Sequence, residues 1–127
     1  MKTKITFFLL CLLLAACSRA TAPSAPDVTL KKDIGDEFKL VFESNPSTGY
    51  HWEIIGGLDS KIVELVQQYY QSNSEVTLVG GGGVDIWVFR AVGAGTTTIT
   101  VGYFPPSNGA SEPEKTETFT LIVARNQ

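Results

Sequence analysis

The clearest strand pattern of the chain is Glu37-Phe38-Lys39-Leu40-Val41-Phe42-Glu43, in which every second residue is large and apolar. Phe38, Leu40 and Phe42 fall on one face of an extended chain, because successive side chains of a strand point to opposite sides. Charged residues at the ends and in between fall mostly on the other face. This alternation predicts a β-strand that buries one face.

Runs of the same kind follow along the chain, separated by clusters of glycine and proline. The segment at 62–71 is also compatible with a short helix, and no long segment has convincing helical spacing. Six or seven short strands in about a hundred residues predict an all-β fold, an immunoglobulin-like antiparallel β-sandwich of about seven strands. Besides 37–43 and an edge strand at 28–31, we expect strands at 52–55, 62–70, 84–92, 96–103 and 116–124.

The order of the strands predicts where the loops lie. If neighbouring strands run up and down in turn, the loops after the first, third and fifth full strands meet at one end of the sandwich. Those loops are the long ones, at 45–50, 71–83 and 104–115, whereas the links at 56–61 and 93–95 are short. We therefore expect one end of the domain to carry the function.

The first of these loops, Asn45-Pro46-Ser47-Thr48-Gly49-Tyr50, has the composition of a rigid turn. Pro46 fixes its own φ and pushes Asn45 toward an extended conformation. Gly49 permits a positive φ or a close backbone approach, and the two hydroxyls of the loop can bond locally. A preformed projection enters a cleft at a low ordering cost, so the loop suits a binding protein. Taken alone, it is also compatible with an ordinary turn.

The other two loops are rich in glycine and proline. Gly80-Gly81-Gly82-Gly83 precedes an expected strand. It suits either a bulge or hinge, or a segment with which the backbone of a partner can pair. Phe104-Pro105-Pro106 gives the third loop a stiff, apolar start. Phe104 is also compatible with the last inward residue of its strand.

The first residues are expected to be a processing signal rather than part of the fold. Lys2 and Lys4 precede an apolar run at 5–14 that is too short to span a bilayer. Leu14-Ala15-Ala16-Cys17 ends the run, and this order of features resembles a bacterial lipoprotein signal over 1–16. A plain secretory signal and an uncleaved anchor are the alternatives.

The lipoprotein interpretation divides the chain further. Cys17 becomes the lipidation site, 17–26 an extended tether rich in Ala, Ser, Thr and Pro, and 27–127 the folded domain. The protein is then held in the membrane by its lipid anchor, in the bacterial cell envelope. Ser18, which follows the cysteine, favours the outer membrane or the periplasmic face.

Composition excludes several classes of function for the expected domain. With Cys17 carrying a lipid the domain has no thiol, and its one histidine is His51. A cysteine–histidine pair and a disulfide framework are therefore excluded, and we expect no enzyme activity and no metal or other cofactor. Removing Lys2 and Lys4 changes the formal charge from −3 to −5 and leaves no basic cluster, so nucleic acid is not an expected partner. We expect a monomer.

Three loops of these types, in this order, resemble the chagasin-type inhibitors of cysteine peptidases, the papain-like peptidase inhibitor family. The first loop of that family reads Asn-Pro-x-Thr-Gly-aromatic, and 45–50 matches it fully. An aromatic residue usually stands at the position of Trp52, and a glycine-rich loop precedes a long strand, as 80–83 does here. The third loop departs, because the family usually has Arg-Pro-Trp where this chain has Phe104-Pro105-Pro106. The resemblance covers 28–124.

The resemblance implies reversible, competitive inhibition of papain-like cysteine peptidases, of a host or of the same cell, by three loops that block the active-site cleft. By the family pattern, the first loop meets the catalytic centre with Thr48 nearest the reactive thiol. The glycine loop lies on the non-primed side and the third loop on the primed side. The absent arginine and tryptophan imply weaker binding or an altered peptidase preference. The implied peptidase-binding residues are Asn45, Pro46, Ser47, Thr48, Gly49, Tyr50, Gly80, Gly81, Gly82, Gly83, Phe104, Pro105 and Pro106.

A function of another class suits the same exposed loops. The chain is also compatible with a surface immunoglobulin-like lipoprotein that acts as a non-inhibitory binding or adhesion module. An inhibition assay separates the two interpretations, because only an inhibitor must block cleavage by a papain-like enzyme at up to equimolar ratios.

Overall fold

The computed structural model describes residues 27–73, 81–107 and 112–126. The predicted signal at 1–16, the lipidation site Cys17, the tether at 17–26 and Gly80 lie outside these residues. Within them, no helix is long and apolar enough to cross a membrane. The elements are β1 (Val28–Asp33), β2 (Glu37–Ser44), the 3-10 turn η1 (Pro46–Thr48), β3 (His51–Ile55), β4 (Val63–Ser72), β5 (Gly83–Ala91), β6 (Gly95–Phe104) and β7 (Lys115–Ala124).

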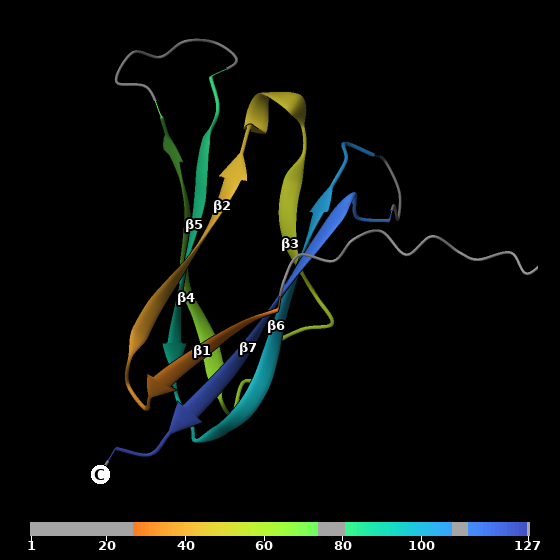
Figure 1. Cartoon of the computed structure of the whole chain (residues 1–127). Coiled ribbons are helices and arrows are strands. Elements are labelled where there is room, and N and C mark those ends of the chain that lie inside the picture. Colours follow the sequence, from red (N-terminus) through yellow and green to blue (C-terminus); the bar gives the residue numbers. More distant parts are fainter. Residues whose placement is uncertain (1–26, 74–80, 108–111, 127) are drawn as a thin grey trace, which may run out of the picture.

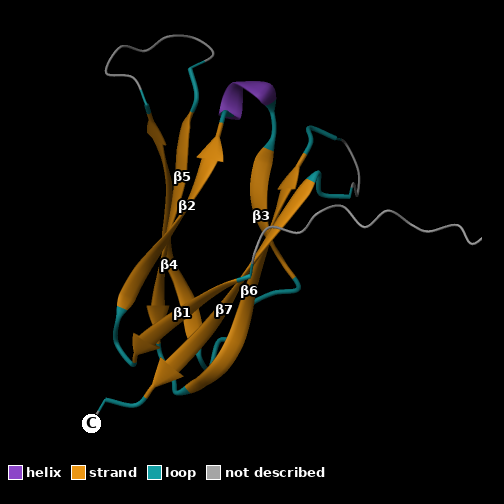
Figure 2. Cartoon of the chain, viewed as in Figure 1, coloured by secondary structure: helices purple, strands orange, loops and turns teal. Residues whose placement is uncertain are grey.

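The strands form two sheets that pack face to face (Figures 1 and 2). One sheet has the order β1-β7-β6-β3 and the other the order β2-β5-β4. Four strand pairs are antiparallel, namely β2 with β5, β4 with β5, β3 with β6 and β6 with β7. The prediction of an all-β, immunoglobulin-like sandwich of about seven strands is confirmed.

One pair departs from the antiparallel pattern that the sequence predicted. The edge strand β1 runs parallel to β7, with Val28 opposite Phe119. The chain leaves β1 through a tight turn at Gly35, whose φ is +96°, and crosses to the other sheet. The Gly35 N–H donates to the carbonyl oxygen of Ala91 on that sheet, at 2.8 Å. Because β2 pairs in the second sheet, β1 has no hairpin partner and adds to the edge at β7 instead.

β4 is a strand, so the helical alternative for this run is wrong. Its register against β5 shifts between Leu65 and Gln67, which leaves Val66 as an extra residue on β4. A β-bulge of this kind moves the following side chains to the opposite face. The bulge therefore explains why the apolar residues of this run do not keep period two.

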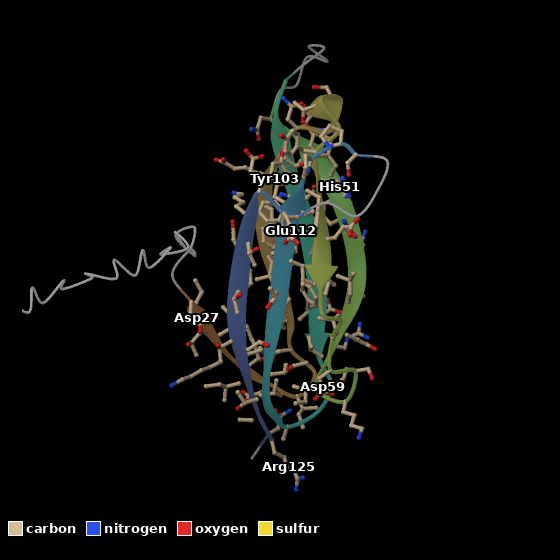
Figure 3. All side chains as sticks on the ribbon, turned by 90° about the vertical axis from the view of Figure 1, so that its right-hand side faces the viewer. Asp27, His51, Asp59, Tyr103, Glu112 and Arg125 are labelled. Carbon is tan, nitrogen blue, oxygen red and sulfur yellow. The ribbon has the colours of Figure 1, made fainter. Side chains whose placement is uncertain are left out.

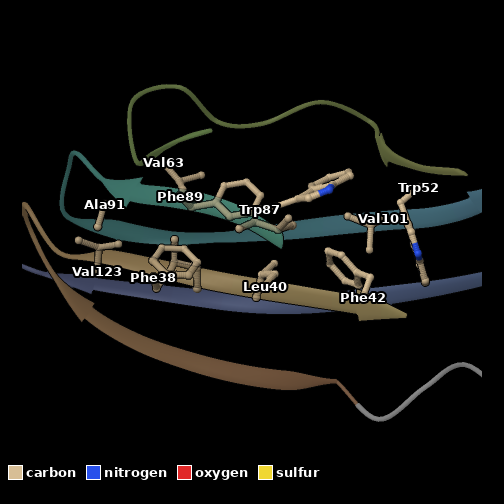
Figure 4. Close-up of a cluster of buried hydrophobic side chains, with 12 residues drawn as sticks. Phe38, Leu40, Phe42, Trp52, Val63, Trp87, Phe89, Ala91, Val101 and Val123 are labelled. Atoms are coloured by element: carbon tan, nitrogen blue, oxygen red, sulfur yellow. The ribbon is translucent and has the colours of Figure 1, made fainter. Parts of the chain in front are cut away.

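The core lies between the two sheets and is rich in aromatic rings (Figure 4). Phe42 contacts Trp52 of the opposite sheet with ring centroids 4.7 Å apart, and it meets Trp87 edge-on at 5.4 Å. Full burial of a side chain the size of Leu or Phe stabilises a fold by about 1.5–3 kcal/mol. The expected inward set of β2 is confirmed, and the rest of the core consists of Val63, Phe89, Ala91, Ile99, Val101, Leu121 and Val123.

The connections from β2 to β3, from β4 to β5 and from β6 to β7 leave the sandwich at the same end (Figure 1). This end is named the loop end below. His51 and Tyr103 lie toward it, whereas Asp59 and Arg125 lie at the opposite end (Figure 3). The prediction that the three long loops share one end is confirmed for their described parts.

Candidate functional site

The first loop (45–50) is a single turn of 3-10 helix between two extended segments. Asn45 has φ −138° and ψ 88°, and Gly49 closes the turn in the left-handed region with φ +80°. The N–H of Thr48 donates to the carbonyl oxygen of Asn45 at 3.0 Å, and that of Gly49 to Pro46 at 3.1 Å. The extended Asn45 and the positive φ of Gly49 are as the sequence predicted.

Side chains close the first loop as well. The hydroxyl of Thr48 donates to the carbonyl oxygen of Asn45 at 2.7 Å, and the hydroxyl of Ser47 donates to the amide oxygen of Asn45 at 2.6 Å. The N–H of Tyr50 donates to the Thr48 hydroxyl at 3.4 Å. The loop is exposed to solvent except for partial burial at its two ends. A loop that bonds to itself in this way keeps its shape without a partner.

Trp52, two residues beyond the first loop, anchors it to the core. Its indole N–H donates to the carbonyl oxygen of Glu43 at 3.0 Å. Its ring packs on Tyr103 with centroids 4.9 Å apart, and the ammonium group of Lys115 lies 4.8 Å from the ring centre. The family resemblance singled out the aromatic residue at this position. Nothing in the sequence indicated the bond to Glu43 or the cation–π contact.

Tyr50 joins the first loop to the third. Its ring stacks on Tyr103 with centroids 5.1 Å apart and an interplanar angle of 24°. The Glu114 carboxylate raises the pKa of the Tyr50 phenol above 10.0, because its negative charge disfavours the phenolate. Desolvation and a hydrogen bond to Glu114 act in the same direction. The backbone N–H of Glu114 donates to the carbonyl oxygen of Tyr103 at 2.8 Å, so both partners of Tyr50 are fixed to each other.

The second loop is described only at its two ends, where its glycines differ. Gly81 and Gly82 are exposed, and the carbonyl oxygen of Gly82 accepts the N–H of Asn73 at 3.2 Å. Gly83 is buried in β5, between Ser44 of β2 and Ser72 of β4.

The prediction that the whole tetraglycine is open to a partner is therefore wrong for Gly83. A methyl group there would overlap the Gln71 carbonyl oxygen and lie 2.5 Å from the Tyr70 hydroxyl. Close packing inside the domain requires glycine at this position.

The start of the third loop is split between two faces. Phe104 lies opposite His51 and stacks on it with centroids 6.1 Å apart. Its ring covers Gly102, where a Cβ atom would be 2.9 Å from the Phe104 ring. Phe104 is thus on the outer face of its sheet, and the alternative of an inward residue is wrong. Pro106, which is exposed, packs instead against Gly49 of the first loop.

A cleft of about 340 Å³ lies between the bases of the three loops. Its lining residues are mostly polar and come from both sheets, so the bases of the three loops surround one space. Among the described residues, no group of three His, Cys, Asp or Glu side chains is placed to hold a metal ion. The lining residues are Glu43, Ser44, Asn45, Asn73, Gly82, Gly83, Tyr103 and Lys115.

Known proteins share this combination of fold and loops. The family model described as Chagasin family peptidase inhibitor I42 matches residues 31–123. The chain is similar to Amoebiasin-2 of Entamoeba histolytica, with 29% identity over 124 residues that cover 97% of this chain and 99% of the relative. It is similar to Chagasin of Trypanosoma cruzi, with 28% identity over 102 residues that cover 77% of this chain and 89% of the relative.

A solved structure agrees with the sequence relatives. The cysteine protease inhibitor EhICP2 from Entamoeba histolytica matches with a TM-score of 0.66 and 27% identity, over 77% of this chain and 87% of that chain. The family match includes all three loops at the loop end, and the family consists of inhibitors rather than enzymes. This chain therefore belongs to the chagasin family of peptidase inhibitors.

Proposed function

We propose that this protein inhibits papain-like cysteine peptidases reversibly and competitively, by filling the active-site cleft with its loop end. The observation that carries the proposal is the first loop, in which the family motif forms a closed turn. The backbone and side-chain hydrogen bonds that close the turn are internal to the loop. Such a loop loses little conformational entropy when a cleft encloses it.

The first loop takes the central role in this proposal, with Thr48 nearest the reactive thiol. The 3-10 turn presents 46–49 to solvent on a base that Trp52 holds to the core. The exposed backbone of Gly81 and Gly82 carries no side chains and suits pairing with an extended partner on the non-primed side. Pro105 and Pro106, in the third loop, pack on the primed side of the peptidase cleft.

The third loop is the part most altered from the family pattern. Phe104 occupies the position of the usual arginine and faces His51 on the outer face of its sheet. Arginine and tryptophan are typical hot-spot residues, and the third loop, 104–115, contains neither. We therefore expect binding that depends mainly on the first loop, and a preference among peptidases that differs from relatives with Arg-Pro-Trp.

The same proposal includes a location. A lipid on Cys17 would hold the domain at the bacterial cell envelope, and the tether at 17–26 would separate it from the membrane. An extended chain spans at most about 3.3–3.6 Å per residue. A tether of this length would keep the domain close to the membrane, where the loop end would have access to peptidases near the cell surface. A monomer suits this arrangement, because each loop end must stay open to one peptidase.

Steady-state inhibition of papain and of a cathepsin L-type enzyme by the purified chain tests the function. Competitive inhibition without cleavage of the chain is the expected result. Thr48→Glu places a charge at the centre of the loop end and is expected to weaken inhibition at least tenfold. Thr98→Glu, at an exposed threonine toward the other end of β6, is the matched control. Equal inhibition by the two variants would contradict the central role of the first loop.

A further inference from the structure

Gly49 and Pro106 are in contact across two loops, and the contact leaves no space for a side chain at Gly49. A Cβ atom at Gly49 would lie 2.8 Å from the Cβ and 3.4 Å from the Cγ of Pro106. Real Cβ contacts are almost never this short, so the proline ring lies against the backbone of the first loop. Gly49 is also the residue whose positive φ of +80° turns the chain back toward β3.

The base of the third loop is held in place, so it can support the first loop. The N–H of Glu114 donates to the carbonyl oxygen of Tyr103 at 2.8 Å across the base of the loop. Tyr103 stacks on Tyr50, which follows Gly49. The first loop and the described part of the third are therefore in contact both at their base and at Pro106. The described glycines of the second loop contact β2 and their own hairpin instead.

We propose that Pro106 is a positioning residue, which holds Gly49 and thereby fixes the shape of the first loop. The proposal rests on the proposed function, and it gives the third loop a role in that function other than direct contact with the peptidase. A glycine that no neighbouring residue restricts samples both signs of φ. The ring of Pro106 restricts Gly49 before a peptidase is met, so less conformational entropy is lost on binding.

Alanine and glycine, the two replacements for Pro106 in the test, differ by the Cβ atom. Pro106→Ala removes the ring but keeps the Cβ atom, which would lie 2.8 Å from a Cβ added at Gly49, and Pro106→Gly removes both. In the wild-type background, we expect Pro106→Gly to raise the inhibition constant for papain by about tenfold and Pro106→Ala by less. Glycine at 106 makes the backbone of the third loop more flexible and also removes the contact that restricts the first loop.

The order of the two variants should reverse when Gly49→Ala is added. In Gly49→Ala with Pro106→Ala the two Cβ atoms still collide, whereas in Gly49→Ala with Pro106→Gly the collision is gone. The strain of a positive φ at alanine is common to both double variants and cancels. The double variant with glycine is therefore expected to inhibit about fivefold better than the one with alanine. Additive effects of the single changes would overturn the proposal.

Melting temperatures of the same variants separate the contact from the function. A wild-type chain that inhibits neither papain nor a cathepsin L-type enzyme overturns the proposed function and the positioning role with it. An active wild-type chain with reversal in the melting temperatures but not in the inhibition constants overturns the positioning role alone. Reversal in both measurements supports the proposal, and Pro105→Ala, which leaves Pro106 in place, should show no coupling to Gly49→Ala in the melting temperature.

Discussion

Trp52 on β3 donates its indole N–H to the carbonyl oxygen of Glu43 on β2, at 3.0 Å. The two strands belong to different sheets, so this bond joins the sheets directly beneath the first loop. The chain between the two residues consists of the last residue of β2, the first loop and His51. The bond thus closes the base of the loop, while the Trp52 ring packs on Phe42 and Tyr103.

Trp52→Phe is expected to destabilise the domain more than Trp87→Phe does. Both tryptophans are buried, but the indole nitrogen of Trp87 has no hydrogen-bond partner among the described residues. Each substitution removes a similar volume, and only Trp52→Phe removes a hydrogen bond. We expect its free energy of unfolding in urea to be lower by about 1–2 kcal/mol than that of Trp87→Phe. Equal values would show that the bond to Glu43 contributes nothing to stability.

Gly83→Ala is expected to be poorly tolerated, whereas Gly82→Ala is expected to fold normally. A methyl group on Gly83 would overlap backbone and the Tyr70 hydroxyl, but at Gly82 its nearest contact is the Ser44 carbonyl oxygen at 3.8 Å. Overpacking of this kind costs about 1–3 kcal/mol, and more where backbone must move. Thermal unfolding of the two variants checks this. A Gly83→Ala variant as stable as Gly82→Ala would mean that β4 and β5 separate there at little cost.

Much of the fold follows from local patterns along the chain. The alternation in 37–43 predicted the inward set of β2, because one buried face requires period two. Up-and-down connections predicted that the loops at 45–50, 71–83 and 104–115 share an end. This prediction requires only that the strands be counted in order. Pro46 and Gly49 predicted the shape of the first loop, since their backbone preferences are intrinsic.

The remaining features depend on contacts between distant segments, which local patterns do not encode. The parallel edge at β1 arises because β2 pairs in the other sheet. Gly83 was predicted to be open to a partner, but β2 and β4 flank it and fill the space beside it. Phe104 faces outward because the register of β6 against β3 places it opposite His51. Sequence spacing alone does not fix that register.

Tyr50 is expected to ionise at a higher pH in the folded domain than in the unfolded chain. The negative charge of Glu114 raises the pKa of Tyr50, so the protonated phenol is favoured in the folded chain relative to the unfolded one. This stabilisation is fully present below the unfolded pKa of about 10 and is lost as the pH rises through the folded value.

Phenolate absorbance measured against pH tests this assignment. Tyr50→Phe should remove a phenolate transition that lies above the unfolded pKa of about 10. Glu114→Gln keeps the size of the side chain, removes its charge and should lower the pKa of Tyr50. An unchanged titration in Glu114→Gln would contradict the assignment of the shift to Glu114.

Thr48→Val tests whether the hydroxyl of Thr48 serves the loop itself. Valine has nearly the same shape but loses the bond to the Asn45 carbonyl oxygen and the acceptor for the Tyr50 N–H. A net hydrogen bond contributes about 0.5–1.5 kcal/mol, so the inhibition constant should rise about twofold to tenfold. Thr48→Ser keeps the hydroxyl and should change it less. The opposite order would show that the Thr48 methyl group, through contact with the peptidase, matters more than the bond within the loop.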